Sequence, residues 1–269
     1  MKFDLRARLA ELGAEPKRSL GQNFLVNTHV VTKIVQEALG KNASQLIEIG
    51  PGPGALTEAL LAADLQPNLI ELDSKFADYW RGRGLEVLEE DALKVDWNRW
   101  VDRPNTLLVS NLPYQIATHL VVERCLGPVN LKYMILMFQK EVAERLMAKP
   151  RTKEYGTLSV LAQTHFRLKK LADAAPKDFY PPPKVASRVL TFERLADPGL
   201  GSRFLTLLKA GFAFRRKFLL KNLKGVVDSA TMQRLPEIWE ELGFKAQCRA
   251  EELTPSEWVK LCQVVYERN

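Results

Sequence analysis

Cysteine is scarce in this chain of 269 residues: Cys125, Cys248 and Cys262 are the only three, and they lie far apart in the sequence. An odd number of thiols without C-x-x-C spacing indicates neither a disulfide framework nor a zinc site, so we expect no bound metal. A reducing cytoplasm is the simplest setting for such a chain.

Long apolar runs are also missing. The longest, from Tyr133 to Phe138, is far too short to span a bilayer. The N-terminal stretch has no apolar h-region, and its Asp4, Glu11 and Glu15 argue against a transit peptide. We therefore expect a cytoplasmic protein that does not enter a membrane.

Histidine is rare as well. His29, His119 and His165 lie in none of the motifs described below. We expect each of them at the surface or in the core rather than in catalysis.

The chain is long enough for one large domain together with a smaller one. It contains 39 Lys and Arg against 32 Asp and Glu, which gives a formal net charge of +7. This balance suits a polyanionic partner without proving one.

Short apolar runs alternate with helical stretches from residue 46 onward, which is typical of a doubly wound α/β sheet. A helix with a polar N-cap is predicted over Asn27 to Leu39, before the first of these runs. Two later strands, separated by a Pro-rich loop, are expected to close the sheet with an antiparallel hairpin. The predicted parallel strands are 46–49, 68–72, 85–88, 106–109 and 132–138, and the predicted hairpin strands are 167–174 and 186–192.

The segment Ala196 to Gly201 is the best candidate linker, because Pro and Gly interrupt the pattern there and the rest of the chain has helical periodicity. Thr254 to Glu257 has the pattern of a capping box with Pro at the first helical position. We therefore predict a domain over 1–195 and a small all-helical domain over 196–269.

A glycine-rich turn, Gly50-Pro51-Gly52-Pro53-Gly54, follows the first predicted strand and opens a helix, where a ligand can approach the backbone. Glu71 ends the second strand and is placed to accept both ribose hydroxyls of an adenosine. Both features also fit a dinucleotide-dependent dehydrogenase. Asp91, after the third strand, could bind an adenine amine or could simply cap a helix.

The tetrapeptide Asn111-Leu112-Pro113-Tyr114 after the fourth strand separates these alternatives, because hydride transfer has no use for it. The N6 lone pair of adenine is delocalised and must be drawn towards tetrahedral geometry before it can attack a methyl donor. The amide oxygen of Asn111 and the carbonyl of Pro113 are suitable acceptors for the N6 hydrogens. Tyr114 offers a surface on which the base can stack. A Pro-Cys nucleophile is absent from this loop, which excludes cytosine C5 chemistry.

With these motifs in order, the chain resembles the bacterial small-subunit rRNA adenine N6,N6-dimethyltransferase family over nearly its whole length. The resemblance implies a Rossmann-like class I methyltransferase domain followed by a helical domain. It also implies dimethylation of two adjacent adenosines in the 3′-terminal hairpin loop of small-subunit (16S) rRNA by S-adenosylmethionine, linked to ribosome biogenesis. The motifs that resemble the family are Lys17–Leu25, Glu48–Thr57, Glu71–Asp73, Asn111–Tyr114 and Phe179–Ser187.

The resemblance also assigns residues. It implies an S-adenosylmethionine pocket and, for the flipped adenine, a second aromatic partner, Phe179, beside Tyr114; Phe179 could instead simply pack its loop. Ser110 and Gln115 stand where many relatives have Gly and Asn. The expected cofactor-binding residues are Asn23, Leu25, Gly50, Gly52, Glu71, Asp91 and Asn111.

Two rival hypotheses remain. Large-subunit rRNA methyltransferases that confer macrolide resistance usually depart from this chain's first glycine loop. Mitochondrial transcription-factor relatives keep the fold but act by nucleic-acid binding. The intact pocket residues favour the enzyme, and the expected lack of a transit peptide disfavours the mitochondrial setting.

A basic segment, Lys209 to Lys224, has no acidic residue and has apolar residues at helical spacing. We expect a helix here with one buried face and a row of ammonium groups for RNA phosphates. We expect a monomer that binds rRNA in an assembling small ribosomal subunit. The candidate RNA-binding residues are Lys17, Arg18, Arg215, Arg216, Lys217, Lys221 and Lys224.

Overall fold

The computed structural model describes residues 3–266 and divides into two compact units. The first contains the chain up to Ala143 together with Leu168–Arg194, and the second contains Glu144–Arg167 together with the chain from Leu195 onward. The second unit includes Glu144–Arg167, which the sequence analysis counted with the first domain, and the predicted domain boundary at 195/196 stays a prediction.

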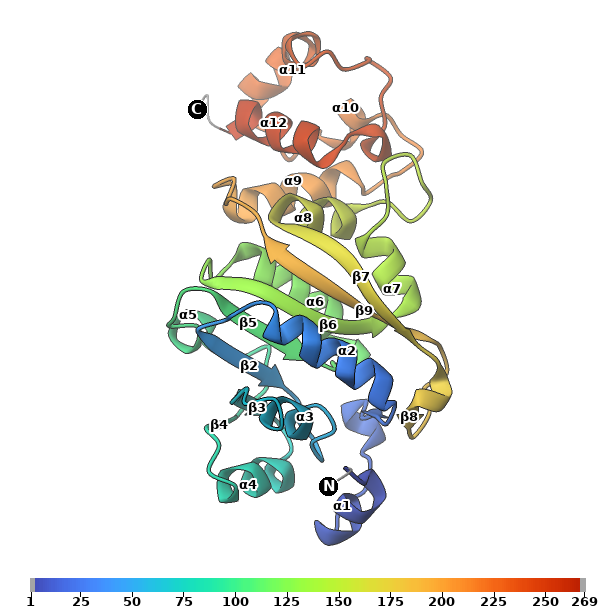
Figure 1. The fold of residues 1–269 in the computed structure, drawn as a ribbon. Helices are drawn as coiled ribbons and strands as arrows, with labels where there is room; N and C mark the ends of the chain where they lie inside the picture. The colour runs from blue at the N-terminus through green and yellow to red at the C-terminus, as the bar shows by residue number, and fades with distance from the viewer. Residues whose placement is uncertain (1–2, 267–269) are drawn as a thin grey trace. The chain divides into compact units, whose positions relative to one another are not determined.

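The first unit is built on a seven-stranded sheet with the order β4-β3-β2-β5-β6-β9-β7 (Figure 1). Strands β2 to β6 pair in parallel, and β9 pairs antiparallel with β6. The doubly wound sheet with an antiparallel end is thus confirmed. The strands are β2 Gln45–Ile49, β3 Asn68–Glu71, β4 Val87–Glu89, β5 Thr106–Ser110, β6 Leu131–Gln139, β7 Phe166–Ala174 and β9 Ser187–Arg194.

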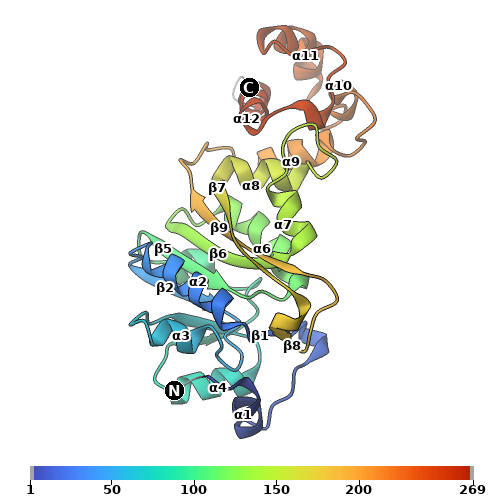
Figure 2. The ribbon, with the colours of Figure 1, turned by 45° about the vertical axis from the view of Figure 1, so that its right-hand side comes forward.

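Helices cover both faces of this sheet, with α2 on one face and α6 on the other (Figures 1 and 2). Asn27 caps α2 as predicted, because its side-chain oxygen accepts hydrogen bonds from the N–H groups of His29 and Val30. Val30 and Ile34 of α2 pack with Leu107 and Val109 of β5 in one buried cluster. The helices of this unit are α1 Leu5–Glu11, α2 Thr28–Leu39, α3 Thr57–Leu61, α4 Ser74–Gly82, α5 Trp97–Trp100 and α6 Tyr114–Leu126, and α7 Lys140–Leu146 runs into the second unit.

A second, two-stranded sheet was not predicted. β1 (Phe24–Leu25) pairs antiparallel with β8 (Phe179–Tyr180), which brings the N-terminal motif beside the Pro-rich loop. Two residues per strand give no period-2 pattern that a sequence could reveal. Only the tertiary contact makes them strands.

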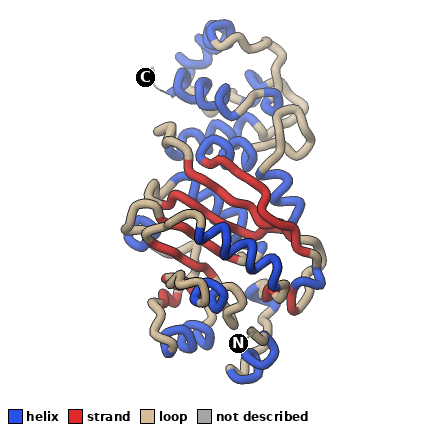
Figure 3. Tube along the Cα trace, in the orientation of Figure 1, coloured by secondary structure: helices blue, strands red, loops and turns tan. Residues whose placement is uncertain are grey.

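Apart from the first two residues of β7, the regular secondary structure of the second unit is helical in the described part of the chain (Figure 3). Thr254 forms the predicted capping box, since its N–H donates to Glu257 Oε2 at 2.7 Å and its Oγ1 accepts from the Glu257 N–H at 3.3 Å. The helices are α8 Thr157–His165, α9 Gly201–Gly211, α10 Leu219–Asn222, α11 Ser229–Glu241 and α12 Pro255–Tyr266.

The continuous helix expected over Lys209 to Lys224 was wrong. Helix α9 ends at Gly211, turns follow, and α10 begins only at Leu219. Trp258 occupies the space beside Gly211, where an added Cβ would lie 2.4 Å from its ring. The Asn222 side chain then donates to the Gly211 carbonyl and, at 3.1 Å, to the Phe214 carbonyl. Tertiary contacts therefore stabilise a turn where the local period favours a helix.

Candidate functional site

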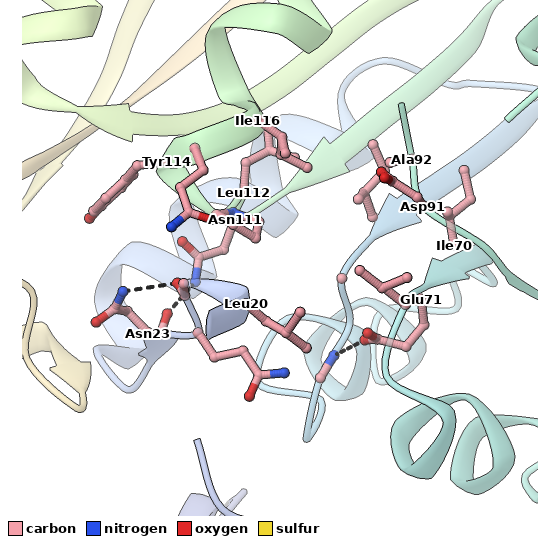
Figure 4. Close-up of a pocket in the computed structure, with 18 of the residues that line it drawn as sticks. Leu20, Asn23, Ile70, Glu71, Asp91, Ala92, Asn111, Leu112, Tyr114 and Ile116 are labelled. Carbon is pink, nitrogen blue, oxygen red and sulfur yellow. Dashed lines mark hydrogen bonds between the residues drawn. The ribbon is translucent and has the colours of Figure 1, made fainter. Parts of the chain in front are cut away.

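A cavity of about 280 Å³ lies at the carboxyl ends of β2, β3, β4 and β5 (Figure 4). This is the edge at which ligands bind in open α/β sheets. Segments far apart in the sequence meet here, because parallel strands place all their carboxyl ends at one edge. The predicted site residues that line the cavity are Asn23, Gly50, Gly52, Glu71, Asp91, Asn111, Pro113 and Tyr114.

The glycine loop follows β2 in a conformation that favours glycine. Gly50 has φ +65° and Gly52 has φ +52°, in the left-handed region. A Cβ on Gly52 would lie 2.8 Å from a ring carbon of Phe24, whereas a Cβ on Gly50 would meet no heavy atom within 4 Å. The Trp80 indole N–H donates to the Gly52 carbonyl at 2.9 Å. Trp80 and Phe24 therefore fix the loop at Gly52, whereas the space beside Gly50 is free for a ligand.

Glu71 connects this loop to the end of β3. Its Oε2 accepts from the Gly52 N–H at 3.0 Å, and its Oε1 accepts from the Asp73 N–H at 2.8 Å. Burial raises the pKa of Glu71, while these backbone donors lower it. Each carboxylate oxygen has a second lone pair, so the group can still accept from a ligand hydroxyl.

Asp91 caps a local turn and also lines the cavity, while its contact with an adenine amine stays a prediction. Its Oδ1 accepts from the Leu93 N–H at 3.0 Å, which caps a turn rather than a helix. The residue also lines the cavity, next to Ile70 and Ala92 (Figure 4). One carboxylate oxygen is thus used locally while the side chain remains beside the cavity.

Asn111 is oriented by the backbone of the N-terminal motif. Its side-chain Nδ2 donates to the Asn23 carbonyl at 2.9 Å (Figure 4). Since the amide nitrogen is engaged there, the Oδ1 atom is the free acceptor end. The Pro113 carbonyl accepts from the Ile116 N–H at 3.2 Å in the first turn of α6 and keeps a second lone pair.

The two positions that depart from the family pattern have different surroundings. Ser110 is buried, and its hydroxyl donates to the Ile49 carbonyl at 2.6 Å, which joins the ends of β5 and β2 beneath the cavity. Gln115 is exposed at the cavity rim. Ser110 therefore supports the site from within the sheet, whereas Gln115 lies in contact with solvent.

Leu25 and Phe179 do not line this cavity. They are paired across β1 and β8, only 2% and 3% exposed, and they belong to the hydrophobic cluster around α2. Both line a separate hollow of about 810 Å³ beside α1, and Leu25 also lines a small cavity together with Gly50 and Asn111. Phe179 packs its loop in this structure, and the cofactor and base contacts predicted for these two residues stay predictions.

The basic residues near the cavity differ in how far their charges are already paired. Lys17 Nζ lies 2.8 Å from Oδ2 of Asp73, a buried carboxylate. Arg18 is exposed. Lys17 therefore joins the N-terminal motif to the helix α4 N-cap, while Arg18 remains open to a ligand.

In the second unit, Arg215 is engaged within the protein. It bonds Oε2 of Glu251 at 2.6 Å and donates to the Lys153 carbonyl at 2.8 Å. The other predicted RNA-binding residues of this unit are exposed, and the Lys217 ammonium lies 4.8 Å from the centroid of the Phe214 ring. The exposed set is Arg216, Lys217, Lys221 and Lys224.

Glu48 is a site residue that the sequence analysis missed. It is 2% exposed on β2, directly before the glycine loop, and lines a small cavity with Gly50 and Asn111. Burial, together with the nearby charge of Glu71, raises the pKa of Glu48 to about 8. Its Oε2 has no hydrogen-bond partner among the described residues. An acidic residue within the otherwise apolar run Leu46–Ile49 was the available signal.

Within residues 3–266, no group of three or more His, Cys, Asp and Glu side chains could hold a metal ion. The same residues contain no helix that is long and apolar enough to cross a membrane.

Comparison with known proteins agrees with this geometry. A family model described as "Ribosomal RNA adenine dimethylase" matches residues 13–264. The ribosomal RNA small subunit methyltransferase A of Bdellovibrio bacteriovorus is 47% identical over 93% of this chain and 92% of its own length. The protein of the same name from Syntrophotalea carbinolica is 38% identical over 93% of this chain and 97% of its own length.

Two solved structures share the fold. A dimethyladenosine transferase from Plasmodium falciparum superposes with a TM-score of 0.78 at 23% identity, covering 91% of this chain and 98% of that one. The 23S rRNA methyltransferase ErmE superposes with a TM-score of 0.65 at 23% identity, covering 90% and 99%. At these identities the likeness supports the architecture alone.

Proposed function

Since the chain belongs to the ribosomal RNA adenine dimethylase family, we propose that it dimethylates two adjacent adenosines in the 3′-terminal hairpin loop of small-subunit rRNA. It is an S-adenosylmethionine-dependent rRNA adenine dimethyltransferase. The observation that supports the target best is the Asn111 amide, whose nitrogen is bound to the Asn23 carbonyl so that its oxygen can accept from an amine.

The cavity suits S-adenosylmethionine. The open space at Gly50 permits close approach of a ligand to the backbone, and the buried Glu71 carboxylate suits a pair of ribose hydroxyls. Asp91, Ile70 and Ala92 offer a carboxylate and two apolar walls for an adenine ring. When bound, the sulfonium supplies an already activated methyl group.

The protein's own contribution is to orient the amine. Asn111 Oδ1 and the Pro113 carbonyl accept the N6 hydrogens of the target adenine, which draws the nitrogen lone pair towards the methyl donor. Tyr114 lines the same cavity and stacks on the base. No general base is required before attack, because the amine becomes strongly acidic once it carries positive charge.

Two acceptors also account for dimethylation. The second transfer needs only one surviving N–H, which either acceptor can bind. A site that required both hydrogens would stop after one methyl group.

RNA contact is assigned to exposed cations in both units. Arg18 lies next in sequence to Ser19, which lines the cavity, and can steer the target strand. Arg216, Lys217, Lys221 and Lys224 present charge to phosphates in the second unit. Arg215 and Lys17 are already paired within the protein and contribute mainly by holding its local structure.

We place residues 1–195 in the catalytic domain and 196–269 in a helical RNA-binding domain. The protein acts as a monomer in the cytoplasm on an assembling small ribosomal subunit. The cytoplasmic location follows from the substrate, because the rRNA of a maturing bacterial subunit is found in the cytoplasm.

Incubation with unmethylated small-subunit particles and methyl-labelled S-adenosylmethionine tests the function. After digestion to nucleosides, we expect label to accumulate in N6,N6-dimethyladenosine from two neighbouring positions. Label confined to monomethyladenosine would contradict the two-acceptor argument. Label in cytidine, or label only with large-subunit RNA, would overturn the target assignment.

A further inference from the structure

The hydroxyl of Tyr114 is held by a single buried serine. Tyr114 Oη and Ser187 Oγ lie 2.5 Å apart. Ser187 is fully buried, whereas Tyr114 is partly exposed and lines the cavity. Burial raises the pKa of Tyr114, so the phenol keeps its proton at neutral pH and the contact is a hydrogen bond between two hydroxyls.

The serine itself has little freedom to move. It is the first residue of β9 and lies opposite Gln139 in the antiparallel ladder between β6 and β9. The preceding residue, Ala186, accepts a hydrogen bond from the Lys140 N–H at 2.9 Å. The backbone that carries this hydroxyl is therefore fixed by the β6–β9 ladder.

The tyrosine ring needs such an anchor. Tyr114 is the first residue of α6, and its hydroxyl is directed away from the Glu71 and Asp91 end of the cavity (Figure 4). Tyr114 lines the cavity and is only partly buried, so protein packing does not enclose the ring completely. A bond at the far end of the side chain removes the remaining rotation about χ1 and χ2.

We propose that Ser187 is a positioning residue for methyl transfer: by binding the Tyr114 hydroxyl, it sets the plane on which the target adenine stacks and therefore the position of N6 before Asn111. This inference rests on the proposed function, in which Tyr114 stacks on the base. A stacking surface that can rotate would hold the amine out of line for a larger fraction of encounters, which lowers the rate without changing cofactor affinity.

Stacking alone and stacking with an anchored ring make different predictions. If only the ring face mattered, Tyr114→Phe would be nearly silent, because phenylalanine offers the same face. With the anchor, Tyr114→Phe and Ser187→Ala each remove the same bond. They should then cause equal losses, and the double variant should lose no more than either single variant.

The test is a double-variant cycle on unmethylated small-subunit particles, with kcat, KM and the calorimetric Kd for S-adenosylmethionine measured for the wild type, S187A, Y114F and the double variant. We expect kcat to fall about five- to tenfold in all three variants, as for loss of one hydrogen bond, with Kd and KM for the cofactor unchanged. The matched control is S159A, which removes another buried serine hydroxyl, bound to the Arg145 carbonyl in the second unit.

Wild-type kcat in S187A, additive losses in the double variant, or a parallel loss of cofactor affinity would each overturn the inference. Should S187A fail to fold, Y114F decides alone, because it removes the bond from the other side, and wild-type kcat in Y114F overturns the anchor. Failure of the proposed function is seen separately: the wild-type protein would then place no label in dimethyladenosine.

Discussion

The cofactor cavity and the basic segment of the helical unit are both rich in predicted site residues, but their side chains are used differently. In the cavity, Glu71 and Asp91 accept hydrogen bonds from backbone N–H groups, Asn111 donates to a backbone carbonyl, and all three side chains line the space. In the basic segment, Arg215 is fully committed to the fold, while Lys217, Lys221 and Lys224 are exposed. A buried site is thus fixed by hydrogen bonds before any ligand arrives, whereas an exposed one depends on charge alone.

This difference predicts that single substitutions will be severe in the cavity and mild in the basic segment. Gly52→Val should have the largest effect and abolish measurable S-adenosylmethionine binding. A Cβ there would lie 2.8 Å from Phe24 in a conformation with φ +52°, so the loop and the Glu71 bond must both move. Titration calorimetry measures the affinity, and circular dichroism verifies the fold. Gly225→Val is the control, since it has φ +85° and no atom within 4 Å of the added Cβ.

Unchanged cofactor affinity in a folded Gly52→Val protein would show that the loop does not belong to the cofactor site. Equal loss in Gly225→Val would mean that the stability of the whole protein, and not the cavity, was being measured.

Asn111→Ala should lower the methyl-transfer rate by on the order of 10²-fold, as the loss of a preorganised acceptor does. Titration calorimetry measures the cofactor affinity beside the rate, because the resemblance assigns Asn111 to the cofactor pocket as well as to the target amine. Single-turnover kinetics with saturating S-adenosylmethionine measure the rate. Asn111→Asp is the informative companion: it keeps an acceptor but loses the donor to the Asn23 carbonyl. Full activity in that variant would show that the orientation of the amide is unimportant.

Glu48 should make the free energy of unfolding depend on pH. Burial raises the pKa of Glu48 from 4.5 to about 8. Below pH 4.5 the carboxyl is protonated in both states and has no effect. Between pH 4.5 and 8 the unfolded chain ionises while the folded protein keeps the proton, so the free energy of unfolding falls by roughly 1.4 kcal/mol per pH unit.

Glu48→Gln should remove this loss and be more stable than the wild type near pH 8, with little difference near pH 5. Urea unfolding of both proteins at the two pH values measures this difference in the free energy of unfolding. Parallel pH profiles for the two proteins would show that Glu48 is not the titrating group.

Replacement of Lys217, Lys221 and Lys224 by Glu should weaken RNA binding, with a smaller effect per residue than the substitutions in the cavity. Each phosphate contact that is lost should flatten the plot of log binding constant against log salt by roughly 0.7 to 0.9. S-adenosylmethionine affinity should stay unchanged. Filter binding at several salt concentrations measures the slope, and reversal of the exposed Lys94, Lys169 and Lys245 provides the same change in net charge elsewhere.

Equal slopes for the two triple variants would mean that net charge, and not this segment, attracts the RNA. No change in either variant would place the RNA contact on other residues.

The fold was largely predictable because the parallel strands are buried on both faces. Such strands are continuous apolar runs, and β2, β3, β5 and β6 are within two residues of their predicted bounds. The N-cap of α2 and the capping box at Thr254 are local patterns and were also predicted correctly. The cavity followed from the same logic, since each motif comes directly after a strand.

Other features could not be predicted because they depend on contacts between distant segments. The helix expected over Lys209 to Lys224 was wrong because Trp258 and Asn222 stabilise a turn after Gly211. The position of Phe179 outside the cavity depends on its pairing with Leu25. The periodicity of a sequence reports which residues share one face of a helix or strand. It does not report contacts with a partner that lies 40 or 150 residues away in the chain.

By itself, the sequence determined the order of strands and helices, the family and the identity of the groups at the carboxyl ends of the strands. These depend on local propensity, apolar periodicity and motif spacing. Only the tertiary structure decided which atoms of those groups are free: the Asn23 carbonyl takes the Asn111 amide nitrogen, Ser187 takes the Tyr114 hydroxyl, and Glu251 takes Arg215. A side chain's chemistry is a property of its residue type, but its free lone pairs and protons depend on the neighbours that folding brings to it.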